Sequence, residues 1–155
     1  MKYRLLLLIL LPVFQLKAAV DMTTVRDLFA SASESSSSCN KLYSMTASGS
    51  LSKDPVLYAY HAAAEMIKAN HSSWPHQKLG HFNAGKVMLE NAIAKYPKDV
   101  EMRYIRYCVQ RGCPFFLGYS SNKAGDKKYV LANMDKTDWS DSYKKKVRDF
   151  LNSQS

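Results

Sequence analysis

The chain has 155 residues, of which 46% are hydrophobic and 23% charged, with only 6 glycines and 5 prolines. This length fits a single domain, and the apolar share excludes a wholly disordered chain. The scarcity of glycine and proline excludes a collagen-like protein and favours helices. The formal net charge is +9. A basic surface can meet acidic lipid, polysaccharide or nucleic acid, but a solvated helix surface is the ordinary explanation.

The start of the chain has the three-part layout of a secretory signal. Lys2 and Arg4 give a basic start, residues 5–11 form an unbroken apolar run, and small residues stand at 18 and 19. The run is shorter than the ~20 residues that span a bilayer, which favours removal over a retained membrane anchor. We expect residues 1–19 to be a signal peptide and residues 20–155 to be one exported domain, periplasmic or extracellular and monomeric. Nucleic acid is not an expected partner in those compartments.

Apolar residues recur every three to four positions along most of the remaining chain, which is typical of amphipathic helices. The sequence therefore predicts an all-α fold of five to six helices. The expected helices span residues 24–46, 54–70, 80–96, 99–112, 123–134 and 140–151. The serine-rich run 33–38 keeps the phase of the first helix and is interpreted as its surface, and residues 71–79 are interpreted as a loop or at most a single turn.

Part of this pattern resembles a tetratricopeptide repeat (TPR). The resemblance lies in the order of small and large residues around a helix-ending proline, namely Gly85, Leu89, Ala92 and Pro97, followed by Met102, Ile105 and Val109. Small residues let two antiparallel helices approach each other, and the proline ends one hairpin before the next begins. The resemblance implies antiparallel helical hairpins in a right-handed, TPR-like arrangement with an inner groove for a ligand.

The chain also resembles a poorly characterised group of exported helical proteins from Gram-negative bacteria. The segments that carry this resemblance are CNKL at 39–42, YHAAA at 60–64, VEMRYIR at 100–106 and FLGY at 116–119. It implies a helical fold and export, and it implies no biochemical activity.

The TPR resemblance places one face of each of two helices in the inner groove. These faces carry His61, Glu65 and Lys68 on one helix and Arg103, Tyr107 and Gln110 on the other. Arg103 and Arg106 stand three residues apart, so their guanidinium groups can converge on a carboxylate of a partner. The alternative is an internal ion pair with Glu65 or Glu101. The predicted partner-binding residues are His61, Glu65, Arg103, Arg106 and Tyr107.

Neither a catalytic motif nor a metal-ligand spacing stands out. The sequence contains no Gly-x-Ser-x-Gly, no His-Glu-x-x-His and no phosphate-binding glycine loop. His71, His76 and His81 are five residues apart, which separates neighbours by about 140° around a helix. We therefore expect no enzymatic activity, no metal and no cofactor. The alternative enzyme would use His61 and Glu65, four residues apart on one helix, as an acid–base pair.

Two local features allow more than one interpretation. Cys108 and Cys113 flank a predicted helix end and are either bridged or thiols, whereas Cys39 fits a buried small hydrophobe. Residues 114–119 contain three aromatic side chains around a turn. Core packing at a helix-to-helix corner is expected there, and an exposed patch for a partner or a lipid surface is the alternative.

These observations predict an exported, non-enzymatic adaptor that binds a protein or peptide partner of the cell envelope in a TPR-like groove. The alternatives are a small periplasmic enzyme and a structural envelope protein that acts on acidic envelope material. In the structural alternative, the basic residues 144–148 touch anionic surfaces. Membrane contact is expected only through such a basic surface.

Overall fold

The computed structural model describes residues 19–153, so the predicted signal peptide lies outside the described residues except for Ala19. All the regular secondary structure of this part is helical, which confirms the predicted all-α class, with seven α-helices instead of five to six. The helices are α1 (Met22–Ser31), α2 (Ser36–Thr46), α3 (Pro55–His71), α4 (Pro75–Lys95), α5 (Val100–Gly112), α6 (Lys123–Asn133) and α7 (Asp141–Asn152). Two short 3-10 helices follow α5 and α6, η1 (Phe115–Leu117) and η2 (Met134–Lys136).

The segment predicted as one helix over residues 24–46 is in fact two helices, α1 and α2. A turn follows α1, and the Ser35 hydroxyl then accepts a hydrogen bond of 3.2 Å from the backbone N–H of Ser38. A serine oxygen at this position satisfies one of the free N–H groups in the first turn of a helix. The serine-rich run therefore separates two helices, and its interpretation as a continuous helix surface is wrong.

Proline placement explains where the next two helices begin. Pro55 starts α3 at nearly the predicted position, and Pro75 starts α4. Proline suits the first turn of a helix because its missing N–H has no intrahelical acceptor there and its φ is already helical. The predicted loop over residues 71–79 is consequently reduced to residues 72–74.

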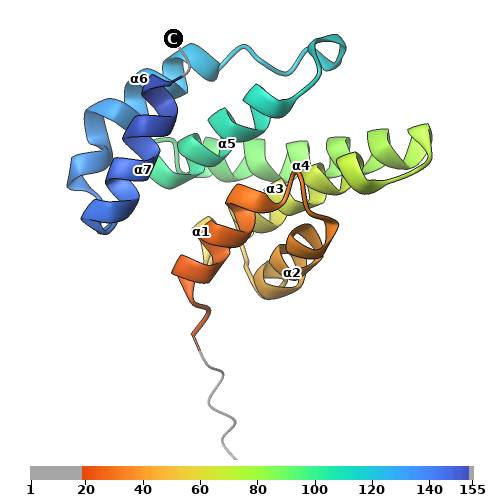
Figure 1. Ribbon diagram of the computed structural model, residues 1–155, viewed down its shortest axis with the longest axis horizontal. Helices are drawn as coiled ribbons and strands as arrows, with labels where there is room; N and C mark the ends of the chain where they lie inside the picture. Colours follow the sequence, from red (N-terminus) through yellow and green to blue (C-terminus); the bar gives the residue numbers. More distant parts are fainter. Residues whose placement is uncertain (1–18, 154–155) are drawn as a thin grey trace, which may run out of the picture.

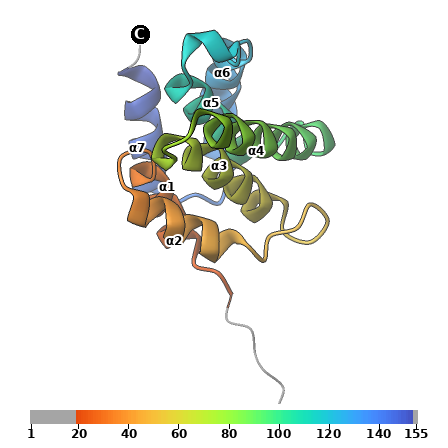
Figure 2. The same cartoon turned by 90° about the vertical axis from the view of Figure 1, so that its right-hand side faces the viewer.

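The central element of the fold is the antiparallel hairpin of α3 and α4. One side of α3 is covered by α1 and α2, and α5 packs on both hairpin helices. On the far side of α5 lies α6, whereas α7 lies beside α1 (Figures 1 and 2). The hairpin helices touch at Gly85, where a Cβ atom would lie 2.3 Å from the Ala62 carbonyl oxygen. Only glycine permits this approach, as the TPR resemblance implies for small residues, whereas the right-handed TPR-like arrangement stays a prediction.

The buried apolar side chains form two clusters. The larger cluster lies among α1 to α5 and includes Leu42, Tyr60, Leu89 and Ile105. The smaller one joins α5 to the C-terminal helices and comprises Tyr107, Val130, Met134, Trp139, Val147 and Leu151. Among the described residues, no helix is both long and apolar enough to cross a membrane.

Candidate functional site

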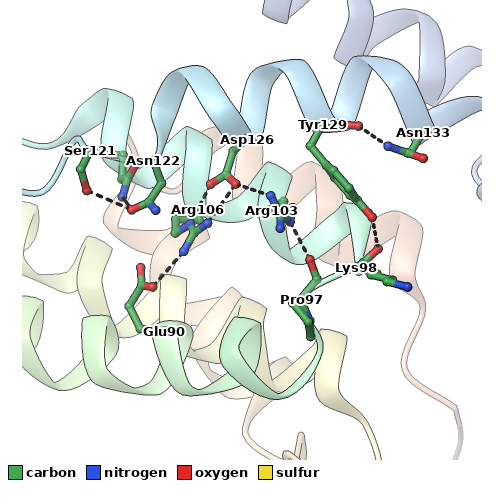
Figure 3. A network of polar contacts seen from close by, with 11 residues as sticks. Glu90, Pro97, Lys98, Arg103, Arg106, Ser121, Asn122, Asp126, Tyr129 and Asn133 are labelled. Atoms are coloured by element: carbon green, nitrogen blue, oxygen red, sulfur yellow. Dashed lines mark hydrogen bonds and ion pairs between the residues drawn. The ribbon is translucent and has the colours of Figure 1, made fainter.

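Arg103 and Arg106 project from α5 toward α6, where both bind Asp126 (Figure 3). Two nitrogens of Arg106, Nε and Nη2, donate to the Asp126 carboxylate at 2.7 and 2.9 Å, and Nη1 donates to Glu90 of α4 at 2.9 Å. Arg103 donates to Asp126 at 3.3 Å and to the Pro97 carbonyl at 2.8 Å. The two arginines thus form internal ion pairs, but with Asp126 and Glu90 instead of the Glu65 or Glu101 named in the alternative.

Glu101, one of the internal partners considered for these arginines, instead accepts four hydrogen bonds from three side chains of other elements. Its carboxylate accepts hydrogen bonds from Nε and Nη2 of Arg26 at 2.7 and 2.8 Å, from the Tyr60 hydroxyl at 2.7 Å and from the Trp139 indole at 3.0 Å. The hydrogen bond to Glu101 raises the pKa of Arg26 further above its usual range. This network joins α1, α3 and α5 to the segment that precedes α7.

His61 and Glu65 lie one turn apart on α3 and have different partners. Glu65 is bound by Nδ1 of His81 at 2.7 Å and by Nζ of Lys68 at 3.2 Å. Partial burial alone would raise the pKa of Glu65, but these hydrogen bonds outweigh it and lower that pKa. Nδ1 of His61 lies 3.1 Å from the Tyr43 carbonyl oxygen, and burial lowers the pKa of His61. The described contacts therefore place the two side chains in separate hydrogen-bonded groups.

Tyr107 belongs to neither group, because it is buried in the smaller apolar cluster. Its ring meets the ring of Phe150 on α7 nearly edge-on, with centroids 6.2 Å apart. The structure therefore divides the five predicted partner-binding residues among three places: the α3 surface with His61 and Glu65, the α5–α6 ion pairs, and the packing between α5 and α7.

A hollow that the sequence analysis did not predict lies where the ends of several helices meet. It is an apolar groove of about 950 Å³, lined by residues of α1, α3, α4, α5, η1 and α7. Its apolar walls include Phe29, Met66, Ile67, Phe82, Val109 and Phe150. This volume is in the range of ligand-binding pockets. None of the five predicted partner-binding residues lines the apolar groove.

Charged side chains also line the apolar groove. Asp27 on α1 lies 4.0 Å from Nζ of Lys146 on α7. The Arg111 guanidinium lies 4.9 Å from the centroid of the Phe150 ring, and Lys78 belongs to the wall formed by α4. The groove therefore combines apolar walls with charged side chains of both signs, an arrangement that suits binding of an amphipathic ligand.

Two of the cysteines, Cys108 and Cys113, line the apolar groove as thiols, so the structure contains no bridge between them. Burial raises the pKa of Cys108 to about 12. This shift favours the neutral thiol over the reactive thiolate at Cys108. Cys39 is buried, as expected. Within residues 19–153, no group of three or more His, Cys, Asp or Glu side chains is arranged to hold a metal ion.

The segment 114–119 differs from the expected core corner. Phe115 and Phe116 are 97% and 83% exposed, whereas Tyr119 is buried and meets Phe82 nearly edge-on at 5.8 Å. The chain turns at Gly118, which has a φ of 60° that favours glycine. The expectation of core packing is therefore right for Tyr119 and wrong for the two phenylalanines. Two adjacent phenylalanines in a short turn were the one local signal of this exposed patch.

Comparisons of the chain with models of known protein families, with curated proteins and with solved structures find no match. The candidate site is therefore defined by the structure of this chain and not by similarity to a known protein. The features that the geometry brings together are the apolar groove, the charged side chains in its lining and the exposed phenylalanines of η1.

Proposed function

We propose that the chain is an exported, non-enzymatic, TPR-like helical adaptor that binds a protein or peptide partner of the cell envelope. The observation that carries this proposal is the apolar groove of about 950 Å³, built from six elements of the fold. Grooves between helices accept the apolar side of a peptide, because anchor side chains of the peptide fill pockets between the helices. The basic start and apolar run of residues 1–19 support export.

In this proposal the side chains that line the apolar groove contact the partner, and the arginines of α5 hold one of its walls. Arg106 is buried and bound to Asp126 and Glu90, so little of its side chain is accessible to a ligand. Tyr107 is likewise buried between α5 and α7. Both residues fix the position of α5, whose last turns contribute Val109 to the groove.

The proposal is tested by filling the groove from its α1 wall. Ala30 is exposed and lines the groove, so Ala30→Trp adds a large side chain there without entering the core. Val87 is 60% exposed on α4 and does not line the groove, so Val87→Trp is the matched control. We expect crosslinking and mass spectrometry in the native host to recover a specific envelope protein with the unmodified chain and the control.

We expect Ala30→Trp to lose this protein while it keeps the thermal unfolding midpoint of the unmodified chain. Recovery of the same protein at the same level with Ala30→Trp would contradict a role for the groove. Failure to recover any specific protein with the unmodified chain would contradict the adaptor function itself.

A further inference from the structure

Four large apolar side chains stand exposed beside one mouth of the apolar groove. Trp74 and Leu79, at the start of α4, are 62% and 50% exposed, and Phe115 and Phe116, on η1, are 97% and 83% exposed. Leu79 and Phe116 both line the groove, so the start of α4 and η1 both reach it. Figure 1 shows the α3–α4 turn and the segment after α5 at the same end of the molecule. We call these four residues the apolar rim.

The two segments that carry the apolar rim contain cations and no carboxylates. Residues 66–89 and residues 102–125 include seven lysines and arginines and not one Asp or Glu. Lys78 and Arg111, which line the groove, are exposed and take part in none of the ion pairs among the described residues. The acidic residues of the groove wall, Asp27 and Glu34, belong to α1 and its following turn.

The basic cluster on α7 offers a weaker attraction for an anionic surface. Lys145 binds Asp149 at 2.6 Å, and Arg148 binds Asp135 at 2.7 Å. These pairs neutralise part of the positive charge of residues 144–148. The exposed aromatic side chains do not belong to α7 either, because Phe115 and Phe116 are part of η1 and Trp74 precedes α4.

From this combination we propose that the apolar rim docks the protein on an anionic lipid bilayer. Phe115, Phe116 and Trp74 enter the interface between headgroups and acyl chains, where amphipathic and aromatic side chains are favoured. Lys78 and Arg111 then meet the lipid phosphates, since unpaired cations are attracted to an anionic leaflet. A membrane fits the apolar rim better than an acidic peptide does. Phe115 is 97% exposed and does not line the groove, so it offers a peptide no pocket to fill, whereas a bilayer can surround it. Docking in this way turns the mouth of the apolar groove toward the membrane.

The test uses the chain from Val20 onward, which contains every described helix and omits the apolar run 5–11. Binding is measured by co-sedimentation with phosphatidylglycerol–phosphatidylcholine vesicles and with pure phosphatidylcholine vesicles. The variant combines Phe115→Ser with Phe116→Ser, and Val87→Ser is the control because Val87 is exposed outside the rim. We expect salt-sensitive binding to the anionic vesicles, unchanged in the control and about tenfold or more weaker in the double variant.

Trp74 reports on insertion directly. It is exposed, whereas the second tryptophan, Trp139, is buried against Glu101. We expect the anionic vesicles to shift the emission of the chain to shorter wavelength and brominated lipids to quench it, and Trp74→Phe to abolish both effects.

Three outcomes would overturn the proposal. One is the absence of binding to anionic vesicles. The second is binding that survives Phe115→Ser with Phe116→Ser but is lost when Lys144, Lys145 and Lys146 become glutamine, which would assign the contact to α7. The third is unchanged vesicle binding by the double phenylalanine variant together with loss of a crosslinked protein partner, which would make the rim a protein-contact surface.

Discussion

At the scale of single residues, Glu101 joins parts of the chain that are far apart in sequence. Its carboxylate accepts four hydrogen bonds, two of them from Arg26 and one each from Tyr60 and Trp139. A buried charge with this many donors is stabilised where it lies, but the loss of either member of the ion pair leaves the other member buried without compensation. The stability of the fold should therefore depend on the charge of Glu101.

We expect Glu101→Gln to lower the free energy of unfolding by about 2–4 kcal/mol, because the amide presents an N–H group where a donor of Arg26, Tyr60 or Trp139 now meets an oxygen. Urea denaturation followed by circular dichroism measures this change. Glu34→Gln is the control, since Glu34 is exposed, and it should change the free energy by no more than about 0.5 kcal/mol. Equal stability of the two variants would contradict a stabilising role for the Glu101 carboxylate.

At the scale of helices, two glycines of α4 test how closely the central hairpin packs. A Cβ atom at Gly85 would lie 2.3 Å from the Ala62 carbonyl oxygen, whereas one at Gly80 meets nothing within 4 Å. Gly85→Ala should therefore cost about 1–3 kcal/mol of unfolding free energy by forcing α3 and α4 apart. Gly80→Ala should add about 0.5–1 kcal/mol, because alanine is the better helix former. Urea denaturation of both variants measures the difference, and shifts of the same sign would contradict the close approach at Gly85.

Helices with a local start or stop signal are the ones that the sequence predicts well. Pro55 begins α3 and Gly112 ends α5 close to the expected positions. The break between α1 and α2 was missed because serine is compatible with a helix surface as well as with a cap. A distant contact contributes to the break, since Nε2 of His71 binds the Ala32 carbonyl oxygen at 2.7 Å. No local pattern reveals a partner 39 residues away.

At the scale of the whole molecule, the sequence predicts which residues share a helix face but not which other helix covers that face. The spacing of Arg103 and Arg106 correctly places them on one face of α5, but α6 covers that face and supplies Asp126 (Figure 3). The apolar groove is assembled from the ends of helices that are separated along the chain, so periodicity within one helix carries no sign of it. Only the adjacent Phe115 and Phe116 mark its mouth in the sequence.

Arg106, on α5, also connects the central hairpin to the C-terminal helices, because it binds Glu90 on α4 and Asp126 on α6. We expect Arg106→Ala to lower the free energy of unfolding by about 3–5 kcal/mol, because Asp126 is 1% exposed and loses its two closest hydrogen bonds. Arg103→Ala should cost about 1 kcal/mol or less, because its side chain is partly exposed and Asp126 keeps Arg106. Denaturation in urea compares the two variants.

Hydrogen exchange then shows where the loss falls. In Arg106→Ala, amides of α6 and α7 should lose protection before those of α3 and α4, because the C-terminal helices depend on the smaller apolar cluster. Unchanged stability of Arg106→Ala would contradict a structural role for the ion pair and would favour the partner contact that the sequence predicts for this arginine. Equal loss of protection in all four helices would show that the two clusters unfold as one cooperative unit, with Arg106 holding the whole domain rather than its C-terminal half.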